Sequence, residues 1–362
     1  MATPRPAVHV VATGGSISGL GPHRLDYILY PELGQRLSIE EMLARIPEAH
    51  DIAEIQAENL IRVGSPSIGP PEWLQLAQRI NALFSSAHPP QGMVVTHGTA
   101  TLEETAYFLH LTVKSERPVV VTGAMRPPTA VGTDADLNFL DAIRLAACPD
   151  AAGRGVLTVL NNEIQSARDV TKFNAFRVET FTSRELGFLG YVDSDGQVMF
   201  YRQVTRLHTT AAPFDVDGRE ALPRVDIIYA YGGADGVLID AIRQHGTDGL
   251  VLAGFGGGSY PNAFLDAGKH AVQAGIPVVL ATRSTAGRVI LTPQKATDGF
   301  IVSDDLMPQK ARILLMLGLT WWFRRGDAKF HEQRNRIHTA QAMDMIENAE
   351  RDEAEHPPDN PV

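Results

Sequence analysis

Residues 94–109, with the sequence VVTHGTATLEETAYFL, begin as a strand and end as a helix. The β-branched run at 94–96 is typical of a buried strand, and the apolar spacing of a helix begins at Leu102. Between them lies a turn of small hydroxyl residues, a histidine and a glycine. Such a strand, turn and helix in succession form one repeating unit of an α/β fold.

Similar apolar runs recur along the chain and alternate with segments of helical period. The helix candidates are residues 71–84 and 101–113, and Pro71 suits the first turn of the former. The strand candidates are nearly continuous in hydrophobicity, as strands buried on both faces are; they are residues 8–13, 92–98, 118–124, 155–162, 225–231, 249–256 and 277–283. The pattern predicts an α/β fold with a largely parallel sheet.

A chain of 362 residues is long for one hydrophobic core, which favours two domains. Residues 201–224 have no sustained period and many turn residues, so we interpret them as a linker between domains at 6–200 and 225–326. Residues 327–362 read as a charged helix with a frayed end.

Composition excludes several classes of protein. The net charge is −10 and no strong basic cluster occurs, which argues against nucleic acid or an anionic membrane as a partner. Cys148 is the single cysteine, so an intramolecular disulfide is impossible and a reducing compartment is permitted. The apolar run from Val8 to Ala12 is too short for a membrane span, and we expect a cytoplasmic protein.

Two turns carry candidate catalytic hydroxyls. In ATGGSISG, residues 12–19, a glycine pair folds the chain tightly and presents Ser16 near exposed amide groups, which suits a nucleophile but also an ordinary turn. In the opening stretch, the hydroxyls of Thr96, Thr99 and Thr101 could simply cap the following helix. We interpret His97 as a structural histidine rather than a base.

Lys172 follows a strong strand in NNEIQSARDVTKFNAF, residues 161–176. A buried lysine can lose its proton and act as a base, although most lysines are solvated. The sequence contains no G-x-S-x-G elbow, no G-K-[ST] phosphate loop and no zinc-ligand spacing, and Ser259 replaces the third glycine of a dinucleotide fingerprint. A hydrolase without cofactor or metal is the remaining plausible class.

Taken together, five stretches resemble the bacterial L-asparaginase/glutaminase family in the same order, from Val8 to about Leu319. They are ATGGSISG (12–19), THGTATLEETAYFLHLTV (96–113), PVVVTGAMRPPTAVGTDADLN (118–138), GRGVLTVLNNEIQSARDVTKFNAF (153–176) and PQKARILLMLGL (308–319). The resemblance implies a larger N-terminal α/β domain and a smaller flavodoxin-like C-terminal α/β domain. It also implies homotetramers built as pairs of intimate dimers, with each site at a dimer interface.

The resemblance further implies amide hydrolysis through a hydroxyl nucleophile and an acyl-enzyme. By position, Ser16 matches the nucleophile, Thr99 a second essential hydroxyl and Lys172 its basic partner. An activating tyrosine follows the first motif; Tyr30 is our choice and Tyr27 is the alternative.

Substrate-binding positions show a consistent set of departures from the family. Ser65, with Ser67 in the same stretch, matches the region that binds the substrate carboxylate, but several groups that would bind a substrate ammonium are replaced. The replacements are Ala100 for aspartate, Pro66 for glutamine, Thr292 near the position of a glutamate, and Gly257 and Ser259 in the loop that should hold an asparagine. Ser16 itself replaces the usual threonine.

A buried ammonium without partners costs several kcal/mol. We therefore expect an amidohydrolase of a substrate that lacks a free α-ammonium: an N-acyl or neutral amide, an imide or a lactam. One alternative is a genuine asparaginase/glutaminase that recruits other carboxylates, with Asp134 and Asp136 as candidates. Another is a non-catalytic, ligand-binding homologue.

Overall fold

The computed structural model describes residues 4–325, which form two compact units. Of the described residues, unit 1 comprises 4–211 with Val216–Ala221, and unit 2 comprises Ala212–Asp215 with 222–325. Residues 201–224 are thus divided between the units, and their only helix is the short 3-10 turn Thr209–Ala211. The expected charged tail at 327–362 lies outside the described residues.

Unit 1 is built on a mixed sheet whose strands lie in the order β10-β9-β6-β5-β4-β3-β1-β2. Their bounds are β1 Ala7–Gly14, β2 Glu54–Val63, β3 Gly92–Thr96, β4 Val119–Thr122, β5 Val156–Leu160, β6 Glu163–Ser166, β9 Gly190–Val192 and β10 Val198–Phe200. The five strands β2, β1, β3, β4 and β5 pair parallel with one another, whereas β6 pairs antiparallel with β5, β9 with β6, and β10 with β9. The expected strands at 8–13, 92–98, 118–124 and 155–162 are present, but the antiparallel edge was not predicted.

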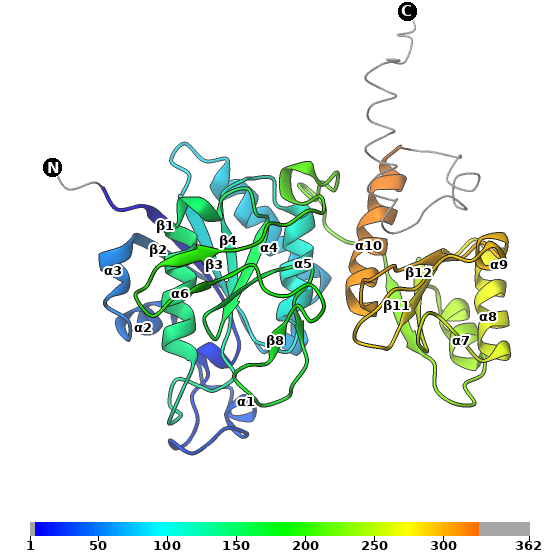
Figure 1. Ribbon diagram of the computed structural model, residues 1–362, viewed down its shortest axis with the longest axis horizontal. Helices are drawn as coiled ribbons and strands as arrows, with labels where there is room; N and C mark the ends of the chain where they lie inside the picture. The colour runs from blue at the N-terminus through cyan, green and yellow to red at the C-terminus, as the bar shows by residue number, and fades with distance from the viewer. Residues whose placement is uncertain (1–3, 326–362) are drawn as a thin grey trace, which may run out of the picture. The chain divides into compact units, whose positions relative to one another are not determined.

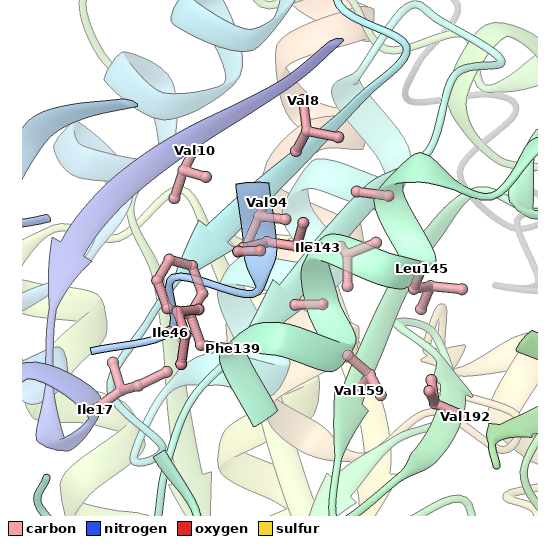
Figure 2. Close-up of a cluster of buried hydrophobic side chains, with 14 of the residues drawn as sticks. Val8, Val10, Ile17, Ile46, Val94, Phe139, Ile143, Leu145, Val159 and Val192 are labelled. Atoms are coloured by element: carbon pink, nitrogen blue, oxygen red, sulfur yellow. The ribbon is translucent and has the colours of Figure 1, made fainter. Parts of the chain in front are cut away.

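Helices cover both faces of this sheet (Figure 1). Their bounds are α1 Tyr30–Leu33, α2 Ile39–Ala44, α3 Ala49–Ile52, α4 Pro70–Phe84, α5 Leu102–Thr112 and α6 Ala135–Ala147. Figure 2 shows Phe139 and Ile143 of α6 packed with Val8, Val10 and Val94. Because successive residues of a strand point to opposite faces, Val11 of β1, also fully buried, faces the other side, where α4 packs on α5.

Unit 2 is a smaller α/β unit with a four-stranded parallel sheet in the order β11-β12-β13-β14. Its elements are β11 Val225–Tyr229, α7 Val237–His245, β12 Gly249–Gly254, α8 Asn262–Gln273, β13 Val278–Thr282, α9 Pro293–Thr297, β14 Ile301–Val302 and α10 Pro308–Arg325. The predicted fold class, a larger and a smaller α/β unit, is confirmed.

The parallel strands place three loops at one edge of the sheet in unit 1. The loops after β1, β2 and β3 begin at the carboxyl ends of neighbouring strands, where ligands of open α/β sheets bind. Ser16, Ser65 and Thr99 lie in these three loops. The two-stranded β7 (Thr171–Lys172) and β8 (Phe181–Thr182) form a separate ribbon that carries Lys172.

Candidate active site

A cavity of about 230 Å³ lies where these loops meet. It is lined by Gly15, Ser16, Gly19, Tyr30, Pro31, Gln35, Arg36, Gly64, Ser65, Pro66, Gly98, Thr99, Ala100 and Lys172. The lining thus brings together Ser16, Tyr30, Thr99, Lys172, Ser65 and Ala100 of the expected site. It contains two basic side chains and no carboxylate among the residues that the structure describes.

Glycines allow the loops to approach this closely. A Cβ atom built on Gly15, whose φ is +89°, would lie 2.2 Å from the Cα of Gly98. A Cβ on Gly98 would lie 2.5 Å from the Oγ of Ser65. Since neither distance is possible for a real side chain, glycine at both positions is what lets the β1, β2 and β3 loops form one wall.

Ser16 is hydrogen-bonded to Tyr30, with 2.7 Å between the two hydroxyl oxygens. Burial raises the pKa of Tyr30; the Ser16 hydrogen bond opposes this rise, and the carboxylates of Asp134 and Asp26 add to it. The phenol is therefore neutral at ordinary pH. Tyr27, by contrast, is exposed and donates to the carbonyl of Val131 at 2.8 Å, away from the cavity lining.

Asp26 fixes the position of Tyr30 and was not singled out from the sequence. Its buried carboxylate accepts backbone N–H bonds from Leu29 and Tyr30, both at 2.9 Å, and a longer one from Ile28. Burial by itself would raise the pKa of Asp26, but these three donors outweigh it and lower the pKa. The carboxylate thus ties down the first turn of α1 at the tyrosine that meets Ser16.

Lys172 donates a hydrogen bond from Nζ to the Oγ1 of Thr99 at 2.8 Å. Burial lowers the pKa of Lys172, and the neighbouring Glu103 carboxylate opposes this effect without reversing it. Glu103 also accepts the backbone N–H of Lys172 at 3.3 Å. Because Thr99 accepts from the lysine, its own hydroxyl proton remains available to another acceptor.

His97 is a structural histidine, as interpreted from the sequence. It is fully buried, with Nδ1 2.8 Å from the carbonyl oxygen of Gly98 and Nε2 2.8 Å from the hydroxyl of Thr105. Thr105 in turn accepts from the indole of Trp73 at 2.9 Å. A carbonyl can only accept, so Nδ1 carries the proton, and the chain Trp73–Thr105–His97–Gly98 fixes the turn before Thr99.

The expected capping of α5 by a threonine hydroxyl is wrong. Thr101 is the N-cap residue of α5, but its side chain makes no capping bond. Its hydroxyl instead donates to the carbonyl of Ser65 at 2.7 Å. The hydroxyl therefore joins the β2 and β3 loops, since the Ser65 Oγ also accepts the backbone N–H of Ala100 at 3.2 Å.

Three residues of unit 1 that the sequence singled out, Ser67, Asp134 and Asp136, are not part of the cavity lining. Ser67 lies in the same 3-10 turn as Ser65, but its side chain is exposed and is not part of this lining, so its role in substrate binding stays a prediction. The Asp134 carboxylate accepts hydrogen bonds from the backbone N–H groups of Met125 and Arg126. Asp136 pairs with Arg45 at 2.7 Å, so neither aspartate lines the cavity. Thr292, Gly257 and Ser259 all belong to unit 2.

Within residues 4–325, no group of three or more histidine, cysteine or acidic side chains is arranged to hold a metal ion. In the same part of the chain, no helix combines the length and hydrophobicity that crossing a membrane requires.

The buried His97 predicts a specific pH dependence of stability. Burial lowers its pKa from 6.5 to about 4, although the Gly98 carbonyl opposes this shift. Between pH 4 and pH 6.5, His97 binds a proton in the unfolded chain but not in the folded chain. The free energy of unfolding should thus keep its full His97 contribution above pH 6.5 and lose about 3 kcal/mol as the pH falls to 4.

Urea unfolding of wild type and His97→Gln at pH 4 to 8 gives the free energy of unfolding at each pH. The difference between the two proteins in how steeply this free energy changes with pH measures the contribution of His97. His50→Gln is the control, because His50 is exposed. Equal slopes for wild type and His97→Gln would show that His97 is not held neutral.

Comparison with known proteins agrees with this architecture. The family model "Asparaginase, N-terminal" matches residues 7–206, and "Glutaminase/Asparaginase C-terminal domain" matches residues 224–325. L-asparaginase 2 of Bacillus subtilis is 43% identical over 315 residues, which cover 87% of this chain and 83% of that protein. A probable periplasmic L-asparaginase of Haemophilus influenzae is 41% identical over 317 residues, covering 87% and 89% respectively. The crystal structure of a probable cytoplasmic L-asparaginase from Campylobacter jejuni has a TM-score of 0.85 at 39% identity and covers 92% of this chain and 99% of that one.

Proposed function

Because the chain belongs to the asparaginase family, it is a hydrolase of amide C–N bonds, and we propose that it acts through Ser16 on a substrate without a free α-ammonium. The observation that carries this proposal is the composition of the cavity wall. Formed by described residues alone, the wall holds the hydroxyl pair Ser16–Tyr30 and the pair Thr99–Lys172, and none of these residues is a carboxylate.

In the proposed reaction, the Ser16 Oγ attacks the carboxamide carbon. Tyr30 accepts the hydroxyl proton while it passes its own proton, through a water molecule, to the neutral amine of Lys172, because its raised pKa disfavours a stable phenolate. The C–N bond then breaks, and the nitrogen leaves as ammonia after it receives a proton through Thr99 and Lys172. A water molecule hydrolyses the ester on Ser16 and releases the acid.

Charge in the cavity supports the proposed substrate class. An amino-acid substrate would bring its ammonium next to Lys172 and Arg36, with no carboxylate in the lining to offset the repulsion. Leaving such a charge unpaired costs several kcal/mol. Ala100 adds no polar group, so this wall suits an uncharged part of a substrate.

The second candidate is a genuine L-asparaginase or glutaminase that takes its acidic groups from elsewhere in the assembly. It is favoured by the relatives, because proteins about 40% identical to this chain are named L-asparaginases.

Ammonia release from a panel of amides separates these candidates. We expect kcat/KM for succinamic acid or N-acetyl-L-asparagine to exceed that for L-asparagine and L-glutamine by about a hundredfold or more, given the cost of an unpaired ammonium. Efficient turnover of L-asparagine would instead establish the second candidate. Thermal-shift binding of the same compounds, measured in parallel, detects a protein that binds these amides without hydrolysing them.

We also propose a cytoplasmic homotetramer, as the family resemblance and the unpaired Cys148 favour. Light scattering after size-exclusion chromatography tests the assembly, and cell fractionation tests the location.

A further inference from the structure

Arg36 is a cationic residue of the cavity wall to which the proposed reaction assigns no role. Its backbone is held firmly, because Gly19 and Arg36 form an antiparallel bridge. The N–H of Leu37 also donates to the carbonyl of Ser18 at 2.7 Å, and that of Leu20 to the carbonyl of Gln35 at 2.9 Å. Arg36 is therefore fixed to the segment that directly follows Ser16.

The Arg36 guanidinium lies beside the β2 loop. A Cβ atom built on Gly64 would be 3.7 Å from the Arg36 Nη2, so the group is adjacent to Ser65. To the residues that the structure describes, its guanidinium donates a single long hydrogen bond, of 3.3 Å from Nη1 to the carbonyl of Gly34. Within residues 4–325, no carboxylate forms an ion pair with it. Most of its five N–H donors are thus available to a ligand.

We propose that Arg36 binds a carboxylate of the substrate, so that the substrate is a carboxamide with one negative charge and no ammonium; this inference rests on the proposed function. A guanidinium matches a planar carboxylate with two parallel hydrogen bonds. Lys172 is directed to Thr99, so among the described residues of the lining Arg36 is the cation without an opposite charge beside it. One such charge fits a monoanion better than a phosphate dianion.

The experiment compares succinamic acid with its neutral methyl ester, which keeps the carboxamide. Arg36→Gln should raise KM for succinamic acid about ten- to a hundredfold, the effect of losing a charge-assisted hydrogen bond. Its KM for methyl succinamate should stay unchanged, and kcat for both should change little. Arg24→Gln removes the same charge from an exposed residue of the same loop, outside the cavity lining, and should behave as wild type.

Binding provides a readout that does not depend on turnover. In a Ser16→Ala background, calorimetry should give a Kd for succinamic acid that rises about ten- to a hundredfold when Arg36→Gln is added, with no change for the ester. Equal affinity of the two proteins for the acid, or equal weakening for acid and ester, would overturn the role of Arg36. If wild type releases no ammonia from either compound, the proposed function fails, and the binding comparison still decides the role of Arg36.

Discussion

Replacing Ser16 with alanine is expected to lower kcat by about 10⁴- to 10⁶-fold on whichever amide the enzyme hydrolyses. The hydroxyl is 2.7 Å from Tyr30 and lines the cavity, whereas alanine has no atom that can form the ester intermediate. Losing the nucleophile removes the entire covalent route, so the residual rate reflects only substrate positioning.

Two measurements make this test specific. Mass spectrometry of acid-quenched wild type should detect an acyl adduct on the peptide that contains Ser16, and the alanine variant should lack it. Ser16→Thr is the matched control, because threonine keeps the hydroxyl and restricts χ1; we expect measurable turnover and the same adduct. Undiminished activity of Ser16→Ala, with wild-type thermal unfolding, would contradict the assignment of the nucleophile.

Local patterns were sufficient to predict most of the parallel strands and the residues beside them, but not β2 and β14. Ser16 and Thr99 each follow a buried strand rich in valine, so strand, turn and hydroxyl are read from one short stretch. The antiparallel strands at the edge of the sheet in unit 1 also have a sequence signal, which the pattern of apolar runs does not include. Asn161 and Asn162 have φ of 53° and 63° and form the two-residue turn between β5 and β6. A pair of asparagines between two strands is typical of such a hairpin.

The rest of the site depends on contacts between distant segments, which no local pattern contains. Arg36 reaches the cavity because its segment pairs with residues 18–20, and nothing in the sequence around it specifies that pairing. The choice between Tyr27 and Tyr30 likewise depends on how Asp26 folds the loop. For Thr101, capping is the ordinary role of its residue type, but its hydroxyl donates instead to the carbonyl of Ser65, which belongs to a distant segment of the chain.

Replacing Lys172 with methionine is expected to lower kcat by about 10²- to 10⁴-fold, the range for losing a general acid–base group. Methionine keeps the unbranched chain and its packing but cannot donate to Thr99, as the lysine does at 2.8 Å. Lys269→Met serves as the control, because Lys269 pairs with Asp298 in unit 2 and should not affect catalysis.

The pH profile distinguishes a base from a fixed cation at position 172. If neutral Lys172 takes up a proton, kcat/KM rises as the pH rises through its pKa, which burial places below that of an ordinary lysine. Tyr30 does not supply this limb, because burial raises its pKa. Lys172→Met should therefore lose the rising limb together with the rate. A wild-type profile that falls over the same range, or a limb that survives in the variant, would mean that Lys172 acts as a charge and that another group moves the proton.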